Sequence, residues 1–178
     1  MLARELDPLD RCLVMRKHLE DKIIDPGQVT RLAREAGHEV SGSDANVYPP
    51  MSTQLKKLGI EIHEGVDAAQ LDVDPDCVVV GNVMRRGVEV VEAMLDRGMP
   101  YKSGPQWLAE NVLNDRHVMA VAGTHGKTTT TSLVASLLAA ADLDPTFVIG
   151  GVVNAWGTHA RLGTGEYLVA EADESDGS

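Results

Sequence analysis

A glycine-containing loop in the second half of the chain combines residue types that bind phosphate. The apolar run Val118–Val121 leads to Gly123 and Gly126, and Lys127-Thr128 then opens a helical pattern. Glycines allow positive φ angles and close backbone approach, and a helix N-terminus adds free N–H groups and its dipole. Lys127 would place a cation on the β- and γ-phosphates, and Thr128 would offer its hydroxyl to Mg²⁺. The pattern therefore predicts a nucleoside triphosphate site.

The loop departs from the strict pattern G-x-x-x-x-G-K-[ST], because Val121 stands where the first glycine would fall. The alternative is an ordinary strand–turn–helix with a surface lysine, but the strand before the loop and the helix after it favour phosphate binding. Within the loop, His125 either contacts the nucleotide or is simply tolerated. The residues predicted to bind ATP are Gly123, Thr124, His125, Gly126, Lys127, Thr128 and Thr129, and Lys127 is the catalytic candidate.

A second apolar run, Tyr167–Ala170, ends in an acidic segment that contains Glu171 and Glu174. Carboxylates at the C-terminal end of a strand beside the phosphate-loop strand are placed to hold the Mg²⁺ of a nucleotide. A solvated acidic loop is the alternative, and the nearby phosphate loop favours the metal role. The predicted metal ligands are Thr128, Glu171 and Glu174, and the predicted cofactors are ATP and Mg²⁺.

Short apolar runs that alternate with helical patterns must position these residues. Such alternation is typical of an α/β fold built on parallel sheets. A boundary is expected near residues 114–116, between an α/β unit that ends at about residue 113 and a second unit. The predicted strands are Glu39–Ser41, Ile60–Ile62, Cys77–Val80, Val118–Val121, Phe147–Ile149 and Tyr167–Ala170.

Composition restricts the class of protein. Of the 178 residues, 43% are hydrophobic but only 3% are aromatic, so the core must be aliphatic. A net charge of -11 repels phosphate backbones and argues against nucleic-acid binding. Cys12 and Cys77 form no metal-type cluster. Neither a signal peptide nor a membrane-spanning run is recognised, which predicts a soluble cytoplasmic protein without a membrane partner.

Residues 1–30 differ from the rest of the chain. They are rich in charge, they contain the turn Asp25-Pro26-Gly27, and no clear strand stands out. A helical interpretation of Leu9–Ile24 is favoured for this segment.

The segment Gly123–Thr130 resembles the ATP loop of the Mur ligases, and the resemblance extends over about residues 31–178. Up to about residue 125, Gly42–Met51 and Ser103–Leu108 are similar to the branch that recycles muropeptides. From about residue 128, Asn154–Gly163 and residues 171–176 are more similar to the UDP-N-acetylmuramate–L-alanine ligases.

This resemblance implies a peptidoglycan-precursor ligase. Such enzymes activate the carboxylate of UDP-N-acetylmuramate as an acyl phosphate, and the amine of L-alanine or of an L-Ala-γ-D-Glu-meso-diaminopimelate peptide then attacks. The implied fold is a Rossmann-like N-terminal unit followed by the start of a P-loop ATPase domain. Residues 1–30 would be a divergent segment, residues 31–113 an incomplete UDP-substrate domain, and residues 114–178 a partial ATP-binding domain. Asp44 would contact the uridine, or alternatively would cap a local Asx turn.

Two departures from the family pattern matter. The family opens with a strand and a glycine-rich loop that cradles the UDP diphosphate, whereas residues 1–30 offer only Gly27. The chain also stops at Ser178, so the sequence is expected to be a fragment that does not ligate by itself. Two other interpretations stay open: a different P-loop ATPase or kinase, and a non-catalytic ATP-binding module.

Overall fold

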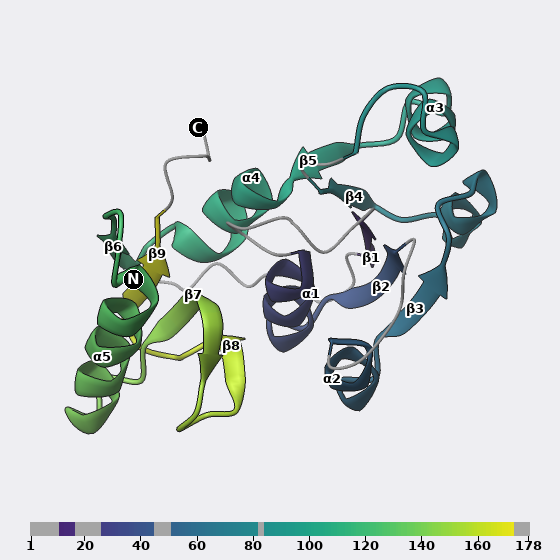
Figure 1. The fold of residues 1–178 in the computed structure, drawn as a ribbon. Coiled ribbons are helices and arrows are strands. Elements are labelled where there is room, and N and C mark those ends of the chain that lie inside the picture. The colour runs from purple at the N-terminus through teal and green to yellow at the C-terminus, as the bar shows by residue number, and fades with distance from the viewer. Residues whose placement is uncertain (1–10, 17–25, 45–50, 82–83, 173–178) are drawn as a thin grey trace.

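The computed structural model describes residues 11–16, 26–44, 51–81 and 84–172. They form two β-sheets (Figure 1). Helical segments connect the strands of the first sheet, whereas in the second sheet α5 connects β6 to β7, and β7, β8 and β9 follow one another directly. The α/β fold with mainly parallel strands is confirmed.

The first sheet has five parallel strands in the order β3-β2-β1-β4-β5. The order reverses at β1, which is the central strand, and this is the arrangement of a doubly wound nucleotide-binding fold. The strands are β1 (Arg11–Arg16), β2 (Glu39–Asp44), β3 (Glu61–Glu64), β4 (Cys77–Val80) and β5 (Tyr101–Ser103). The helical segments are α1 (Pro26–Glu35), α2 (Met51–Lys57), η1 (Ala68–Val73), α3 (Glu89–Asp96), α4 (Gly104–Leu108) and η2 (Ala109–Leu113).

Strand β1 corrects the helical interpretation of Leu9–Ile24 at residues 11–16, and the rest of that segment lies outside the described residues. Arg11–Arg16 pairs along its length with β2 and also pairs with β4, so its backbone groups are used by two neighbours. Four apolar residues between two arginines carry no clear period, and a run this short fits a strand or a helix equally. Pairing with β2 and β4, which lie far away in the sequence, makes this segment a strand.

The second sheet has four strands in the order β6-β9-β7-β8. Strand β9 lies parallel to β6 on one side and to β7 on the other, whereas β8 returns antiparallel to β7. The antiparallel hairpin was not expected from the sequence. The elements are β6 (His117–Val121), α5 (Lys127–Ala140), β7 (Thr146–Val153), β8 (Thr158–Arg161) and β9 (Tyr167–Glu171).

Helix α1 is shared between the two sheets. Figure 1 shows it between strands β1 and β2 of the first sheet and strands β7 and β8 of the second. Its fully buried Val29, Leu32 and Ala33 belong to one core cluster that also includes Val79 of the first sheet and Leu168 of the second. Burying a valine or leucine side chain contributes ~1.5–3 kcal/mol to stability. The packing of α1 therefore couples the two sheets.

Candidate functional site

The loop between β6 and α5 has the backbone form that close approach to an anion requires. Gly123 has φ +150° and Gly126 has φ +77°, and Gly126 is the N-cap of α5. Side chains with a Cβ atom rarely adopt such positive φ values. Residues 122–126 and 128–130 are exposed, so the first turn of α5 opens to solvent. The first N–H groups of a helix lack intrahelical partners, and here they face an open loop.

Lys127 is the first residue of α5, and its ammonium group folds back over the loop. Its Nζ donates to the carbonyl oxygen of Gly123 at 2.9 Å. This contact holds the cation at the mouth of the loop, where a phosphate would meet both the charge and the N–H groups. Beside it, Nδ1 of the exposed His125 lies 3.2 Å from Oγ1 of Thr124.

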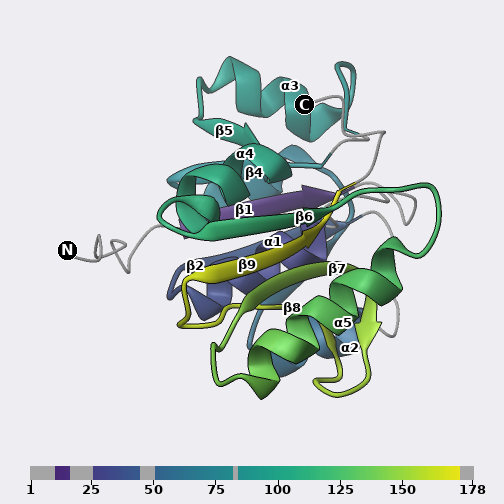
Figure 2. The same ribbon diagram turned by 90° about the vertical axis from the view of Figure 1, so that its left-hand side faces the viewer.

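Glu171 and Thr128 meet at the same edge of the second sheet. Glu171 is the last residue of β9 and is the register partner of Val121, the last residue of β6. Figure 2 shows these two strands side by side with the loop to α5 beyond their ends. Thr128 Oγ1 donates to Glu171 Oε1 at 2.9 Å, and Gly150 N donates to Glu171 Oε2 at 2.7 Å. Both carboxylate oxygens are therefore fixed in direction.

Two glycines of β7 make room for this pair, and neither was among the residues predicted from the sequence. A Cβ atom on Gly150 would lie 3.1 Å from Glu171 Oε2, and one on Gly151 would lie 3.1 Å from Cγ2 of Thr128. Adjacent glycines inside a strand indicate close approach of another group. That signal was present in Gly150-Gly151 and could have located the site from the sequence.

The donor set fits a magnesium ion held together with a nucleotide. Mg²⁺–oxygen bonds of ~2.1 Å at right angles separate neighbouring ligand oxygens by ~3 Å, close to the Thr128–Glu171 spacing. Mg²⁺ commonly takes one or two protein ligands and completes its shell with phosphates and water. Within the described part of the chain, no three His, Cys, Asp or Glu side chains form a metal-binding group. Glu174 lies outside the described residues.

Asp44 lies on the other sheet, at the carboxyl end of β2. Its carbonyl oxygen accepts a hydrogen bond from Gly65 N at 2.9 Å. The buried Ser43 hydroxyl contacts the carbonyl oxygen of Gly65 at 2.8 Å and also the side-chain oxygen of Gln70. These bonds fasten the end of β2 to the turn that follows β3.

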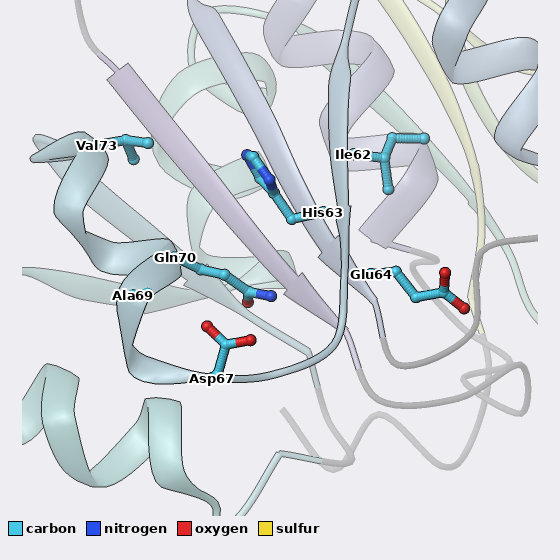
Figure 3. A pocket seen from close by; sticks show the side chains of 7 residues that line it. All are labelled: Ile62, His63, Glu64, Asp67, Ala69, Gln70 and Val73. Atoms are coloured by element: carbon cyan, nitrogen blue, oxygen red, sulfur yellow. The ribbon is translucent and has the colours of Figure 1, made fainter.

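A pocket of about 380 Å³ opens next to this turn. In Figure 3, His63 points into the space between β3 and η1, and the side chains of Asp67 and Gln70 approach one another at its edge. The lining residues are Ile62, His63, Glu64, Asp67, Ala69, Gln70 and Val73. The pocket gives the carboxyl edge of the first sheet a polar hollow beside the strand that ends in Asp44.

Comparison with known proteins decides the family. A family model described as the Mur ligase family, catalytic domain, matches residues 26–116. The chain belongs to the Mur ligase family. The resemblance that the sequence motifs indicated is thereby confirmed, although the matched residues end before the phosphate loop of this Mur ligase chain.

Two curated relatives represent the two branches seen in the motifs. The UDP-N-acetylmuramate–L-alanyl-γ-D-glutamyl-meso-2,6-diaminoheptandioate ligase of Escherichia coli (strain K12) is 55% identical over 150 residues, covering 84% of this chain and 33% of the relative. The UDP-N-acetylmuramate–L-alanine ligase of Neisseria gonorrhoeae is 47% identical over 150 residues, covering 84% of this chain and 31% of the relative. This Mur ligase chain therefore spans about a third of the length of the curated relatives it matches.

A solved structure shares the arrangement of both sheets. The UDP-N-acetylmuramate:L-alanyl-γ-D-glutamyl-meso-diaminopimelate ligase from Neisseria meningitides superposes with a TM-score of 0.83 at 50% identity. The match covers 92% of this chain and 53% of that chain.

No helix among the described residues is both long and apolar enough to cross a bilayer.

Proposed function

We propose that residues Gly123–Thr129 bind ATP and that Thr128 and Glu171 bind its Mg²⁺, with Glu174 as a further ligand. The observation that carries this proposal is the 2.9 Å contact between Thr128 Oγ1 and Glu171 Oε1 at the open N-terminus of α5. Lys127 Nζ, now on the Gly123 carbonyl, would transfer to the β- and γ-phosphate oxygens. The first turn of α5 would donate its backbone N–H groups to the same phosphates.

The proposed reaction of the whole enzyme is ATP-dependent amide ligation on UDP-N-acetylmuramate. ATP supplies a phosphoryl group that activates the muramoyl carboxylate, and an amine then displaces phosphate to leave the amide. The amine belongs to L-alanine or to an L-Ala-γ-D-Glu-meso-diaminopimelate peptide. Both curated relatives carry UDP-N-acetylmuramate in their names, which supports this donor.

The chain's own residues would bind the nucleotides and the metal ion and would orient the reacting groups. Lys127 would neutralise charge on the transferred phosphoryl group, a contribution made by positioned cations in phosphoryl transfer. Glu171 and Thr128 would fix the metal on the phosphate side of the loop. At the other sheet, Asp44 and the neighbouring pocket would contact the uridine. In Figure 2 the arrowheads of β1, β6 and β9 point to the same side, so both nucleotide sites would share one face of the molecule.

We further propose a cytoplasmic location, because both nucleotide substrates are cytoplasmic metabolites. Neither a nucleic acid nor a membrane is proposed as a partner, since the net charge of -11 opposes binding to other polyanions.

Calorimetry of the 178-residue chain with ATP and Mg²⁺ tests the proposal. Lys127→Ala should weaken ATP binding by ~1.5–3 kcal/mol, the range for hydrogen bonds to charged groups. That range corresponds to a ~10–150-fold rise in Kd. Lys57→Ala removes an exposed lysine of α2, a helix that packs against β3 of the first sheet, and should leave Kd unchanged. Equal affinity of wild type and a folded Lys127→Ala variant would refute the assignment.

A further inference from the structure

We propose that Gln28 is a positioning residue for Glu171 and acts through the peptide bond between Ile149 and Gly150. The inference rests on the proposed function, because Glu171 is there the magnesium-binding carboxylate. It adds a physical connection from α1, which packs against both sheets, to the metal ligands of the second sheet. Gln28 lies in the first turn of α1, 121 residues away from Ile149 in the sequence.

The path from Gln28 to Glu171 begins with a buried hydrogen bond between α1 and β7 of the second sheet. Gln28 is 2% exposed, and its Nε2 donates to the carbonyl oxygen of Ile149 at 2.7 Å. The register of β7 with β9 ends at Val148, and its register with β8 shifts between Val148 and Val153. Ile149 therefore lies where the regular ladder is interrupted, and a buried carbonyl needs a partner. The side chain of Gln28 supplies that partner.

The second step passes through one planar peptide unit. The carbonyl of Ile149 and the N–H of Gly150 belong to the same peptide, so fixing the direction of one fixes the direction of the other. Gly150 N donates to Glu171 Oε2 at 2.7 Å. A hydrogen bond accepted by a peptide carbonyl also polarises the N–H of that peptide and strengthens its donation.

The third step is the orientation of the carboxylate. With Oε2 held by Gly150, the other oxygen, Oε1, faces Thr128 Oγ1 at 2.9 Å. The hydrogen bonds thus run without a break from Gln28 through the peptide and Glu171 to Thr128. Partners of a metal-binding carboxylate orient it and tune metal affinity. Gln28 would therefore act on the metal without touching it.

A second hydrogen bond of α1 provides a matched control. Leu162 N, which follows β8, donates to Glu35 Oε2 at 2.7 Å. This bond also joins α1 to the second sheet, but none of its atoms belongs to the path that leads to Glu171. Loss of either bond would loosen the attachment of α1, whereas only the loss of Gln28 would release the carboxylate.

The test measures by calorimetry the affinity of the 178-residue chain for ATP, once with and once without Mg²⁺. The ratio of the two affinities is the metal-dependent gain in ATP affinity. Gln28→Leu removes the donor at similar volume and should lower this gain about tenfold, the low end of the ~10–100-fold effect of losing a partner of a metal ligand. Its affinity for metal-free ATP should stay unchanged, and Glu35→Leu should retain the full gain. In a Glu171→Gln background, Gln28→Leu should have no further effect on the gain.

The outcomes separate this inference from the proposed function. If wild type shows no metal-dependent gain, the ATP–Mg²⁺ proposal fails and this inference fails with it. If wild type shows the gain and a cooperatively folded Gln28→Leu variant keeps it, only the role of Gln28 is overturned. Should Gln28→Leu not fold, Gln28→Met offers a flexible side chain of similar length that also lacks the N–H donor. Retention of the full gain in that variant would overturn the inference equally.

Discussion

The first turns of α1 and α5, the helices that follow β1 and β6, have opposite surroundings. The first turn of α5 is exposed and follows two glycines with positive φ. The first turn of α1 is buried: Gln28 is 2% exposed, Val29 0% and Thr30 3%. The N-terminus of a helix binds an anion only where the ligand can reach its N–H groups. The first turn of α5 is therefore accessible to a ligand, whereas the first turn of α1 is buried in a helix that contacts both sheets.

The largest effect should come from the core of α1. Leu32 is fully buried in the cluster shared by both sheets, so Leu32→Ala should lower the free energy of unfolding by ~2–5 kcal/mol. Leu137 on α5 is 61% exposed, and Leu137→Ala should change stability by no more than ~0.5 kcal/mol. Urea unfolding followed by fluorescence measures both.

The two tryptophans separate the sheets in this experiment. Trp107 lies in α4, which packs against β4 and β5 of the first sheet, and Trp156 packs against Phe147 of the second. In single-tryptophan variants, Leu32→Ala should lower both unfolding midpoints together. A shift of only one midpoint would contradict a shared core.

Ligand binding should differ between the two turns. The sequence between β1 and α1, residues 17–25, contains no glycine, and the first turn of α1, which follows it, is buried. A diphosphate requires close backbone approach, so we expect UDP-N-acetylmuramate to bind this chain ~100-fold more weakly than ATP–Mg²⁺, or ~2.7 kcal/mol. Calorimetry with each ligand measures the difference. Micromolar affinity for UDP-N-acetylmuramate would show that residues 17–25 replace the glycine loop.

A smaller effect is expected from replacing glycines that have positive φ. Comparing two such replacements distinguishes the cost of backbone strain from the loss of phosphate contact. Gly126 has φ +77° and Gly157 has φ +63°, and a Cβ atom at either position meets nothing within 4 Å. Gly126→Ala and Gly157→Ala should therefore each cost ~1–2 kcal/mol of stability from left-handed strain. Only Gly126→Ala should also weaken ATP binding, because Gly157 lies in the β7–β8 hairpin. Equal ATP affinity of both variants would argue against the loop as the phosphate site.

The smallest effect concerns the far end of α5, where Asp144 precedes β7. Hydrogen bonds from the backbone N–H and the hydroxyl of Thr164, at 2.8 and 2.7 Å, and then the Arg161 guanidinium, lower the pKa of Asp144 from 3.8 to about 2. A lowered folded-state pKa stabilises the fold above the unfolded value of 3.8, and that stabilisation is lost as the pH falls through about 2.

We expect Asp144→Asn to lower stability at pH 7 by less than ~1 kcal/mol, because the group is partly exposed and screened by solvent. The difference from wild type should shrink between pH 4 and pH 2, as urea midpoints measured across this range would show. A difference that persists at pH 2 would assign the effect to packing rather than to the charge of Asp144.

The glycine loop between β6 and α5 could be predicted from the sequence because its residues are contiguous. Gly123, Gly126 and Lys127-Thr128 lie within six positions, and the apolar strand before them and the helix after them are local patterns. Glu171 was also predictable, because a carboxylate at the end of a strand that pairs with β6 must reach the same edge. The roles of these residues remain proposals, whereas the family and the α/β fold are confirmed.

Three features were decided only by the tertiary structure. Arg11–Arg16 became a strand because β2 and β4 pair with it from both sides, which no local pattern in six residues could specify. Gly150 and Gly151 gained their importance from side chains that arrive from β9 and α5. Gln28, a polar residue in a short helix, found its acceptor 121 residues away. The sequence by itself determines which groups can do chemistry where neighbours along the chain supply the context. Long-range packing decides which of them face a ligand and which are buried as partners, because burial and pairing depend on segments that meet only after folding.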